Sequence, residues 1–156
     1  MRKGEAQGLY RGCGAKASLD LDGSGKAAVN TGYGFLDHML TAFARTAQLD
    51  LNAEAEMGLY RTQAMGEALG QALNESLGER IGIRRYGSAS VPMDEALADV
   101  ALDFSGRPYL ISTGKFQSER IGDFEAQLLK PFLEALCVGA RLTLQDRKST
   151  RLNSSH

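Results

Sequence analysis

The chain is poor in the residues that cross-link small proteins or bind metal ions. Its 156 residues include two cysteines, two histidines, three prolines and no tryptophan. Cys13 and Cys137 are too few and too far apart in the sequence for a disulfide scaffold or a cysteine metal knuckle. A secreted, disulfide-rich mini-protein is therefore excluded, and a reducing, cytoplasmic location is expected.

Long apolar runs and an excess of one charge are also lacking. No run is long enough to span a bilayer, and no apolar stretch follows residues 1–5, so neither a membrane segment nor a secretion signal is predicted. Eighteen Lys and Arg residues against nineteen Asp and Glu residues leave a net charge of −1, which argues against a nucleic-acid-binding protein. A hydrophobic content of 43% predicts one core, or two half-domains that share one.

Two hydrophobic periods divide the chain into strands and helices. Apolar residues alternate over 15–21, 49–56 and 100–104, which predicts strands, and the glycine-rich turn at 22–25 indicates a β-hairpin in the first part. Helical stripes cover 35–47, 65–77 and 124–136. The second stripe ends near Gly78, and Pro131 lies inside the third, where it should kink or restart the helix. The predicted fold class is α+β.

A weak internal repeat organises these elements. The string at 21–26 (LDGSGK) resembles 102–107 (LDFSGR), and 49–51 (LDL) resembles 142–144 (LTL). Between them, Phe35 and Phe43 match Phe124 and Phe132. The sequence therefore predicts a tandem repeat of hairpin, helix, strand and helix, whose second unit lacks its last helix.

The repeat also sets the predicted domain boundaries. The first unit covers 1–90 and closes with the helix at about 64–78, and the incomplete second unit covers 91–146. Residues 147–156 (RKSTRLNSSH) have one large apolar residue and no usable period. We interpret them as a non-native segment or a disordered basic tail.

Few side chains are candidates for chemistry. His38 lies about 155° around its helix from the centre of the apolar stripe, which predicts an exposed side chain, either an ordinary surface histidine or a ligand. Arg84, Arg85, Arg107 and Arg120 lie near glycines, a pattern that suits phosphate binding and equally suits solvated surface charges. The carboxylates of Asp94 and Glu95 could orient a ligand or cap a helix, and Asp37 could simply begin one.

Five strings, in order over about residues 9–146, together resemble imidazoleglycerol-phosphate dehydratase. They are residues 31–40 (TGYGFLDHML), 85–89 (RYGSA), 92–97 (PMDEAL), 102–110 (LDFSGRPYL) and 120–124 (RIGDF). This family is a lyase of histidine biosynthesis that converts imidazole glycerol phosphate into imidazole acetol phosphate and water. The resemblance implies a tandem α+β fold of the ribosomal protein S5 domain 2-like kind. It also implies a homo-oligomer in which trimers assemble into a 24-mer, with active sites at subunit contacts.

The resemblance further implies a metal-dependent site. Two Mn²⁺ ions bind the imidazole ring in this family, because the C–H bond beside the ring is too weakly acidic without a Lewis acid. Carried over by position, His38 is a metal ligand, Arg85 and Arg107 bind the substrate phosphate, and Asp94 lies near the substrate.

Most of the family's remaining site residues are missing. A His-His-x-x-Glu string is expected before 68–73 (ALGQAL), where this chain has 59–64 (LYRTQA), and a second string would lie beyond residue 146. Gly12, Pro131 and Gln145 stand where the family has a glutamate and two histidines. Two metal ions need about eight protein ligands between them, so no catalytic set is retained and this chain is predicted to be inactive as written.

Three interpretations remain open. The chain is an enzyme-family member whose sequence is truncated and altered around the first metal string, or a pseudoenzyme that keeps an anion-binding or assembly role. The third is a nucleic-acid binder that uses Arg84, Arg85 and Arg107, suggested by the resemblance of the fold to RNA-binding ribosomal domains. The net charge argues against it, so the expected partners are a small phosphate ester and copies of the chain, with no nucleic acid and no membrane.

Overall fold

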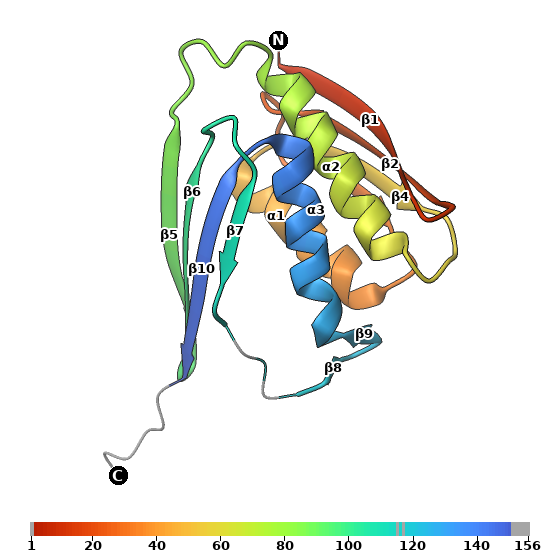
Figure 1. The fold of residues 1–156 in the computed structure, drawn as a ribbon, viewed down its shortest axis with the longest axis vertical. Helices are drawn as coiled ribbons and strands as arrows, with labels where there is room; N and C mark the ends of the chain where they lie inside the picture. The colour runs from red at the N-terminus through yellow and green to blue at the C-terminus, as the bar shows by residue number, and fades with distance from the viewer. Residues whose placement is uncertain (1, 115, 117, 151–156) are drawn as a thin grey trace.

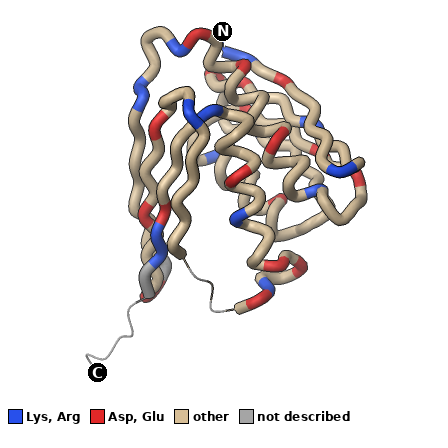
Figure 2. Tube along the Cα trace, viewed as in Figure 1, with Lys and Arg blue, Asp and Glu red and all other residues tan. Residues whose placement is uncertain are grey.

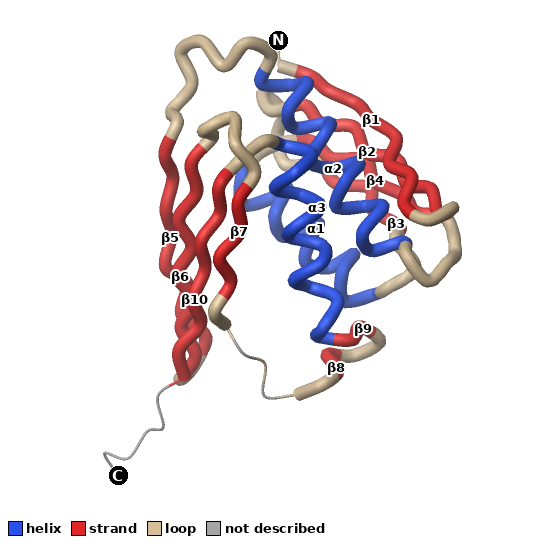
Figure 3. Tube along the Cα trace, in the orientation of Figure 1, coloured by secondary structure: helices blue, strands red, loops and turns tan. Residues whose placement is uncertain are grey.

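A computed structural model describes residues 2–114, 116 and 118–150. Two four-stranded sheets form its outer layers, and helices α2 (Arg61–Leu77) and α3 (Leu129–Ala140) lie between them (Figures 1 and 3). Helix α1 (Gly34–Ala47) packs against the first sheet. No helix in the described part of the chain is both long and apolar enough to cross a membrane.

The first sheet contains β1 (Lys3–Tyr10), β2 (Cys13–Asp20), β3 (Ala27–Asn30) and β4 (Asp50–Ala55) in the order β1-β2-β4-β3. Its hairpin is β1–β2, which turns at Arg11 and Gly12, both with positive φ. The predicted hairpin turn at 22–25 is wrong, because this segment connects β2 to β3, and β3 pairs in parallel with β4. Positive φ at both Arg11 and Gly12 gives the β1–β2 turn a twist that matches the right-handed twist of the two strands it joins.

The second sheet has the same design. Its strands are β5 (Tyr86–Met93), β6 (Ala96–Asp103), β7 (Tyr109–Ser112) and β10 (Thr143–Thr150), in the order β5-β6-β10-β7, and β7 is again parallel to β10. The tandem repeat is therefore confirmed. The short strands β8 (Arg120–Ile121) and β9 (Phe124–Glu125) form a separate hairpin before α3.

Two predicted boundaries differ from the observed elements. Strand β5 begins at Tyr86, inside the predicted first unit, because the second sheet starts with the strand that precedes the predicted boundary. Strand β10 continues to Thr150, where it pairs with β6, so residues 147–150 are in a strand and not in a disordered tail. The rest of the predicted tail, residues 151–156, lies outside the described residues.

The third helix begins later than its apolar stripe. Phe124 lies in β9, a short 3-10 turn covers Ala126–Leu128, and α3 starts at Leu129, so Pro131 occupies the first turn of a restarted helix. Proline is tolerated there because the first backbone N–H groups of a helix have no partner within it. Within the described residues no helix follows β10.

The two units end their first helices in the same way. Gln48 and Arg141 both adopt the left-handed conformation, and the next residue in each case donates its N–H back into the helix, Leu49 to Ala44 and Leu142 to Cys137. If Gln48 and Arg141 are equivalent, Phe43 in the first unit is equivalent to Leu136 in the second. The predicted match of Phe35 and Phe43 with Phe124 and Phe132 is therefore wrong by about one helical turn.

Asp123, from the loop between β8 and β9, caps α1 of the first unit. Its carboxylate accepts hydrogen bonds from the N–H groups of Gly34 (2.7 Å) and Phe35 (3.2 Å), and these bonds hold its pKa below the usual value of 3.8. Tyr33, at the N-cap position, makes no side-chain cap of its own. One side chain thus ties the second unit to the first.

Replacing this carboxylate should weaken the fold in a pH-dependent way. We expect Asp123→Asn to lower the melting temperature at pH 7 by about 2–4 °C, because a helix N-terminus loses its anionic cap. The wild-type advantage requires the ionised carboxylate, so it should shrink as the pH falls below 3.8 and the native side chain becomes protonated. Circular dichroism melts at pH 7 and pH 3 measure both effects.

Glu95→Gln is the matched control, because Glu95 is exposed in the β5–β6 turn. This control should melt with the wild type at both pH values. A difference between Asp123→Asn and wild type that is the same at pH 7 and pH 3 would contradict the capping role.

Candidate functional site

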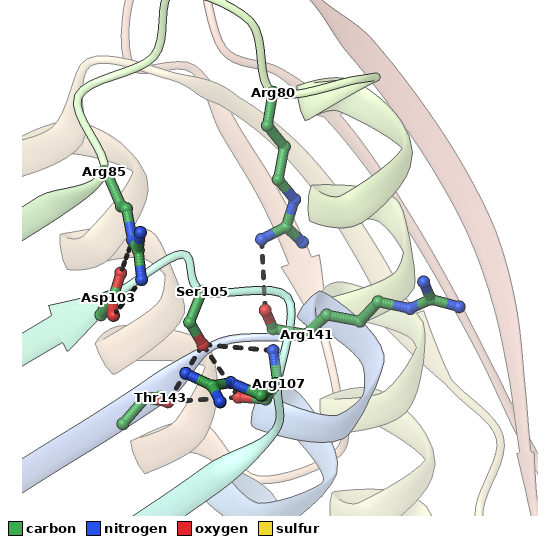
Figure 4. Close-up of polar contacts among 7 residues, drawn as sticks. All are labelled: Arg80, Arg85, Asp103, Ser105, Arg107, Arg141 and Thr143. Carbon is green, nitrogen blue, oxygen red and sulfur yellow. Dashed lines mark hydrogen bonds and ion pairs between the residues drawn. The ribbon is translucent and has the colours of Figure 1, made fainter.

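The structure distributes the four candidate residues over three places. Arg85 directly precedes β5 and Arg107 lies between β6 and β7, so both are at one end of the second sheet (Figure 4). Asp94 is in the β5–β6 turn, at the opposite end of an eight-residue strand that spans about 26 Å. His38 lies on α1 of the first unit. A single chain therefore brings the two arginines together and leaves Asp94 and His38 apart from them.

Arg85 is held in place by a carboxylate. Its Nε is 2.6 Å from Oδ1 of Asp103 and its Nη2 is 3.1 Å from Oδ2, a two-pronged ion pair that raises the pKa of Arg85. The guanidinium carbon also lies 5.0 Å from the centre of the Tyr86 ring. Since the Arg85 side chain remains 49% exposed, a ligand can still reach it. Asp103 thus orients the guanidinium and also offsets part of its charge.

Arg107 is positioned through its backbone. The Ser105 hydroxyl accepts a hydrogen bond from the Arg107 N–H (3.1 Å) and donates one to the Arg107 carbonyl (3.2 Å), to which Thr143 Oγ1 also donates (3.1 Å). Gly106 has a φ of +84°, which allows the tight turn. Three hydrogen bonds between side-chain hydroxyls and the Arg107 backbone therefore fix the turn, while the Arg107 residue as a whole is exposed.

Two further arginines, which sequence reasoning did not single out, belong to this end of the sheet. Arg80 donates to the carbonyls of Ala140 and Arg141 (3.2 Å to the latter) and to Asn74 Oδ1 (2.9 Å). Burial, and secondarily the charge of Arg141, lower the pKa of Arg80. The Arg141 carbonyl also accepts from the Gly106 N–H (3.0 Å), so Arg80 braces the turn that carries Arg107.

No sequence signal points to the hydrogen bond from Arg80 to the Arg141 carbonyl, because Arg80 lies in a linker without periodicity. Figure 2 shows cationic residues both on the linker that enters β5 and on the segments beside the end of α3. Arg120 is not part of this group, since it lies on β8, outside the second sheet, where it pairs with Glu125 of β9 at 3.4 Å. The arginine-rich end of the second sheet, defined by Arg80, Arg85, Arg107 and Arg141, is the best candidate for binding an anion.

The residues that could hold a metal are scattered. His38 is exposed on α1, and the neighbouring Asp37 accepts from the N–H (2.7 Å) and hydroxyl (2.6 Å) of Thr31, which makes it a helix-start residue. Cys13 and Cys137 are buried, and burial raises the pKa of Cys137 to about 11. The residues that the structure describes contain no group of three or more His, Cys, Asp or Glu placed to hold a metal ion. This donor set does not fit a pair of Mn²⁺ ions within one chain.

Comparisons with known proteins agree with one another. A family profile described as imidazoleglycerol-phosphate dehydratase matches residues 31–156. The protein of that name from Methanosarcina barkeri is 46% identical over 92% of this chain and 78% of its own length, and that from Acetivibrio thermocellus is 43% identical over 89% and 74%. The crystal structure of the Staphylococcus aureus protein superposes with a TM-score of 0.83 at 35% identity, covering 96% of this chain and 86% of that one. The chain therefore belongs to the imidazoleglycerol-phosphate dehydratase family, whose members are lyases.

Proposed function

We propose that this chain binds a small phosphate ester of the imidazole glycerol phosphate type at the arginine-rich end of the second sheet, and that it does not catalyse the dehydration. The observation that carries the second part is the ligand set. His38 is the one histidine in the described residues, it is exposed, and no metal-binding group surrounds it. The family's Mn²⁺ chemistry consequently has no support from these residues.

The geometry at the arginine-rich end supports the first part. Arg85 and Arg107 present planar guanidinium groups suited to phosphate oxygens. Before a ligand arrives, Asp103 holds the Arg85 guanidinium and Ser105 holds the backbone of Arg107. Asp103 is the carboxylate that pairs with Arg85, and it would share that guanidinium with the phosphate. Preorganised donors bind an anion more tightly than flexible ones because less conformational entropy is lost.

The positions of the replaced residues support the lack of turnover. Gly12 lies in the β1–β2 turn, Pro131 in the first turn of α3, and Gln145 on β10. Glycine and proline offer no side-chain ligand, and a glutamine amide is a weak metal ligand compared with imidazole. Each substitution thus removes a donor that the resemblance assigns to the metal site.

The separation of the candidate residues favours assembly. His38 and Asp94 are both exposed; His38 lies on α1 of the first unit, and Asp94 lies at the other end of β5 from Arg85. If they serve one site, they meet only when copies of the chain come together. A homo-oligomer is therefore part of the proposal, and sedimentation velocity measures its size directly.

The test combines metal content, turnover and binding. We expect the protein purified with Mn²⁺ to hold no stoichiometric metal and to convert imidazole glycerol phosphate no faster than buffer does. The same protein should bind this ester in titration calorimetry, and Arg107→Gln should weaken binding about tenfold, since a charged hydrogen bond to phosphate contributes about 1.4 kcal/mol.

Arg45→Gln, on an exposed position of α1, is the matched control and should bind like the wild type. Two bound metal ions together with turnover would overturn the proposed inactivity. Equal binding by the Arg107→Gln and wild-type proteins would overturn the anion site.

A further inference from the structure

The first turn of α2 carries buried polar atoms that have no hydrogen-bond partner. In the described part of the chain three side-chain atoms are of this kind, and they lie on consecutive residues: Nε of Arg61, Oγ1 of Thr62 and Oε1 of Gln63. Thr62 is 0% exposed. Such atoms have lost their hydrogen bonds to water without gaining others, which folded proteins rarely leave uncompensated. Their position on a single turn calls for a common partner.

The backbone of the same turn is also uncapped. Tyr60, at the N-cap position, makes no side-chain hydrogen bond to the helix, and the first turn contains no acidic residue. The N–H of Ala64 donates to the carbonyl of Tyr60 (3.0 Å), whereas those of Thr62 and Gln63 have no backbone acceptor among the described residues. The Thr62 side chain leans toward the same free N–H groups, because side chains tilt toward the N-terminus of their helix. Side-chain and backbone donors thus lie together at the start of α2.

Arg61 makes this end of α2 positive. Its guanidinium carbon lies 3.8 Å from the centre of the Tyr33 ring, and its Nη1 donates to the sulfur of Met57 (3.1 Å). These two contacts hold the side chain in place. The ion pairs of the described residues do not include Arg61. The helix dipole adds a partial positive charge at the same end, so a partner with a negative charge is favoured.

The neighbouring helix shows which chemical group satisfies such donors. In the first turn of α1, the N–H groups of Gly34 and Phe35 donate to the carboxylate of Asp123. These bonds, and to a smaller extent the charge of Arg61, lower the pKa of Asp123. Tyr33 directly precedes α1 and contacts Arg61, so the two helices begin close to each other. A carboxylate caps α1, and α2 presents the same kind of donors.

We propose that the first turn of α2 binds the carboxylate group of a small organic acid. A carboxylate has about four lone-pair positions on two oxygens. The donors that match them are the N–H groups of Thr62 and Gln63, the Thr62 hydroxyl and Nε of Arg61. Rotation of the Gln63 amide exchanges its oxygen for an NH2 donor, which suits the same ligand. The single negative charge of the ligand balances the single positive charge of Arg61.

This ligand is opposite in charge to the one that the resemblance implies for this segment. The resemblance places a metal-binding His-His-x-x-Glu string before 68–73, where this chain has 59–64 (LYRTQA). Leu59 and Arg61 offer no electron pair to a metal ion, and the charge of Arg61 repels a cation. The start of α2 is at the other end of this helix from Arg80, so the inference does not depend on the anion proposed at the arginine-rich end.

Acetate is the probe, with chloride at equal ionic strength and the neutral analogue acetamide as references. We expect acetate to raise the melting temperature of the full chain by about 2–4 °C relative to chloride, and acetamide to leave it unchanged. Thr62→Val keeps the shape of the side chain and removes the hydroxyl. In chloride this variant should melt above the wild type, because it buries no unpartnered oxygen. In acetate it should lose this advantage, because the wild-type hydroxyl then donates to the carboxylate.

Thr46→Val, at an exposed position of α1, is the matched control and should respond to acetate as the wild type does. Arg107→Gln should also respond normally, which separates this site from the arginine-rich end, and Arg61→Gln should abolish the response. Equal melting of the wild type in acetate and chloride would overturn the proposal. So would an acetate shift that Thr62→Val and Arg61→Gln retain, as a general salt effect. A Thr62→Val protein that melts equally far below the wild type in both salts would assign the hydroxyl to buried water and overturn it as well.

Discussion

Gly4→Ala should remove about 3 kcal/mol of the unfolding free energy, the larger end of the range for overpacked sites. The added methyl group would overlap the Ala72 carbonyl and lie 2.7 Å from the Ser76 nitrogen. Both atoms belong to the backbone in the middle and end of α2, so they cannot rotate away as a side chain could. The helix must then shift as a unit on β1 and lose contacts with Ala15, Ala17 and Leu19. Urea unfolding followed by circular dichroism measures the loss.

Gly87→Ala is the matched control, because Gly87 is the equivalent residue of the second unit. Gly87 pairs with Leu102 in the second sheet as Gly4 pairs with Leu19 in the first. We expect it to alter the unfolding free energy by no more than about 0.5 kcal/mol, since its Cβ would make one ordinary contact at 3.8 Å. Equal losses for Gly4→Ala and Gly87→Ala would show that a helix covers both sheets. That result would contradict this prediction.

Phe124→Ala should remove about 3–5 kcal/mol of the unfolding free energy, which is typical of truncating a buried phenylalanine. Phe124 is 1% exposed. Its ring is stacked on Phe35 with the ring centres 5.5 Å apart, and it meets Tyr33 edge-on at 5.5 Å. It projects from β9 of the second unit into the core of the first, beside the Asp123 cap on α1. Its loss opens a cavity between the units.

Phe116→Ala is the control for this second prediction, since Phe116 is 40% exposed and its ring centre lies 5.1 Å from the Lys148 ammonium. We expect a loss below about 1 kcal/mol from this variant. Urea unfolding with a near-ultraviolet signal from the tyrosines reports on both variants. A Phe124→Ala protein as stable as Phe116→Ala would show that β9 does not hold the two units together.

Local pattern was sufficient for much of the fold. The stripes at 35–47 and 65–77 predicted α1 and α2 because one face of each helix is buried, and burial imposes a helical period on the sequence. The hairpin turn was misplaced because Arg11 takes a positive φ without being a residue type that signals one. Pro131 marked the restart of α3 correctly, since its effect on the backbone is local.

The order of motifs in the chain established its family and named Arg85 and Arg107, because the residue types and spacings of a binding string are properties of the chain alone. The brace from Arg80 to Arg141, the pairing of Arg85 with Asp103, the distance of Asp94 from both arginines and the open face at Gly87 emerged only from the folded arrangement. Each of these features depends on atoms that are far apart in the sequence and come together, or fail to, through packing of whole elements. Such contacts leave no periodic trace in the residues that make them.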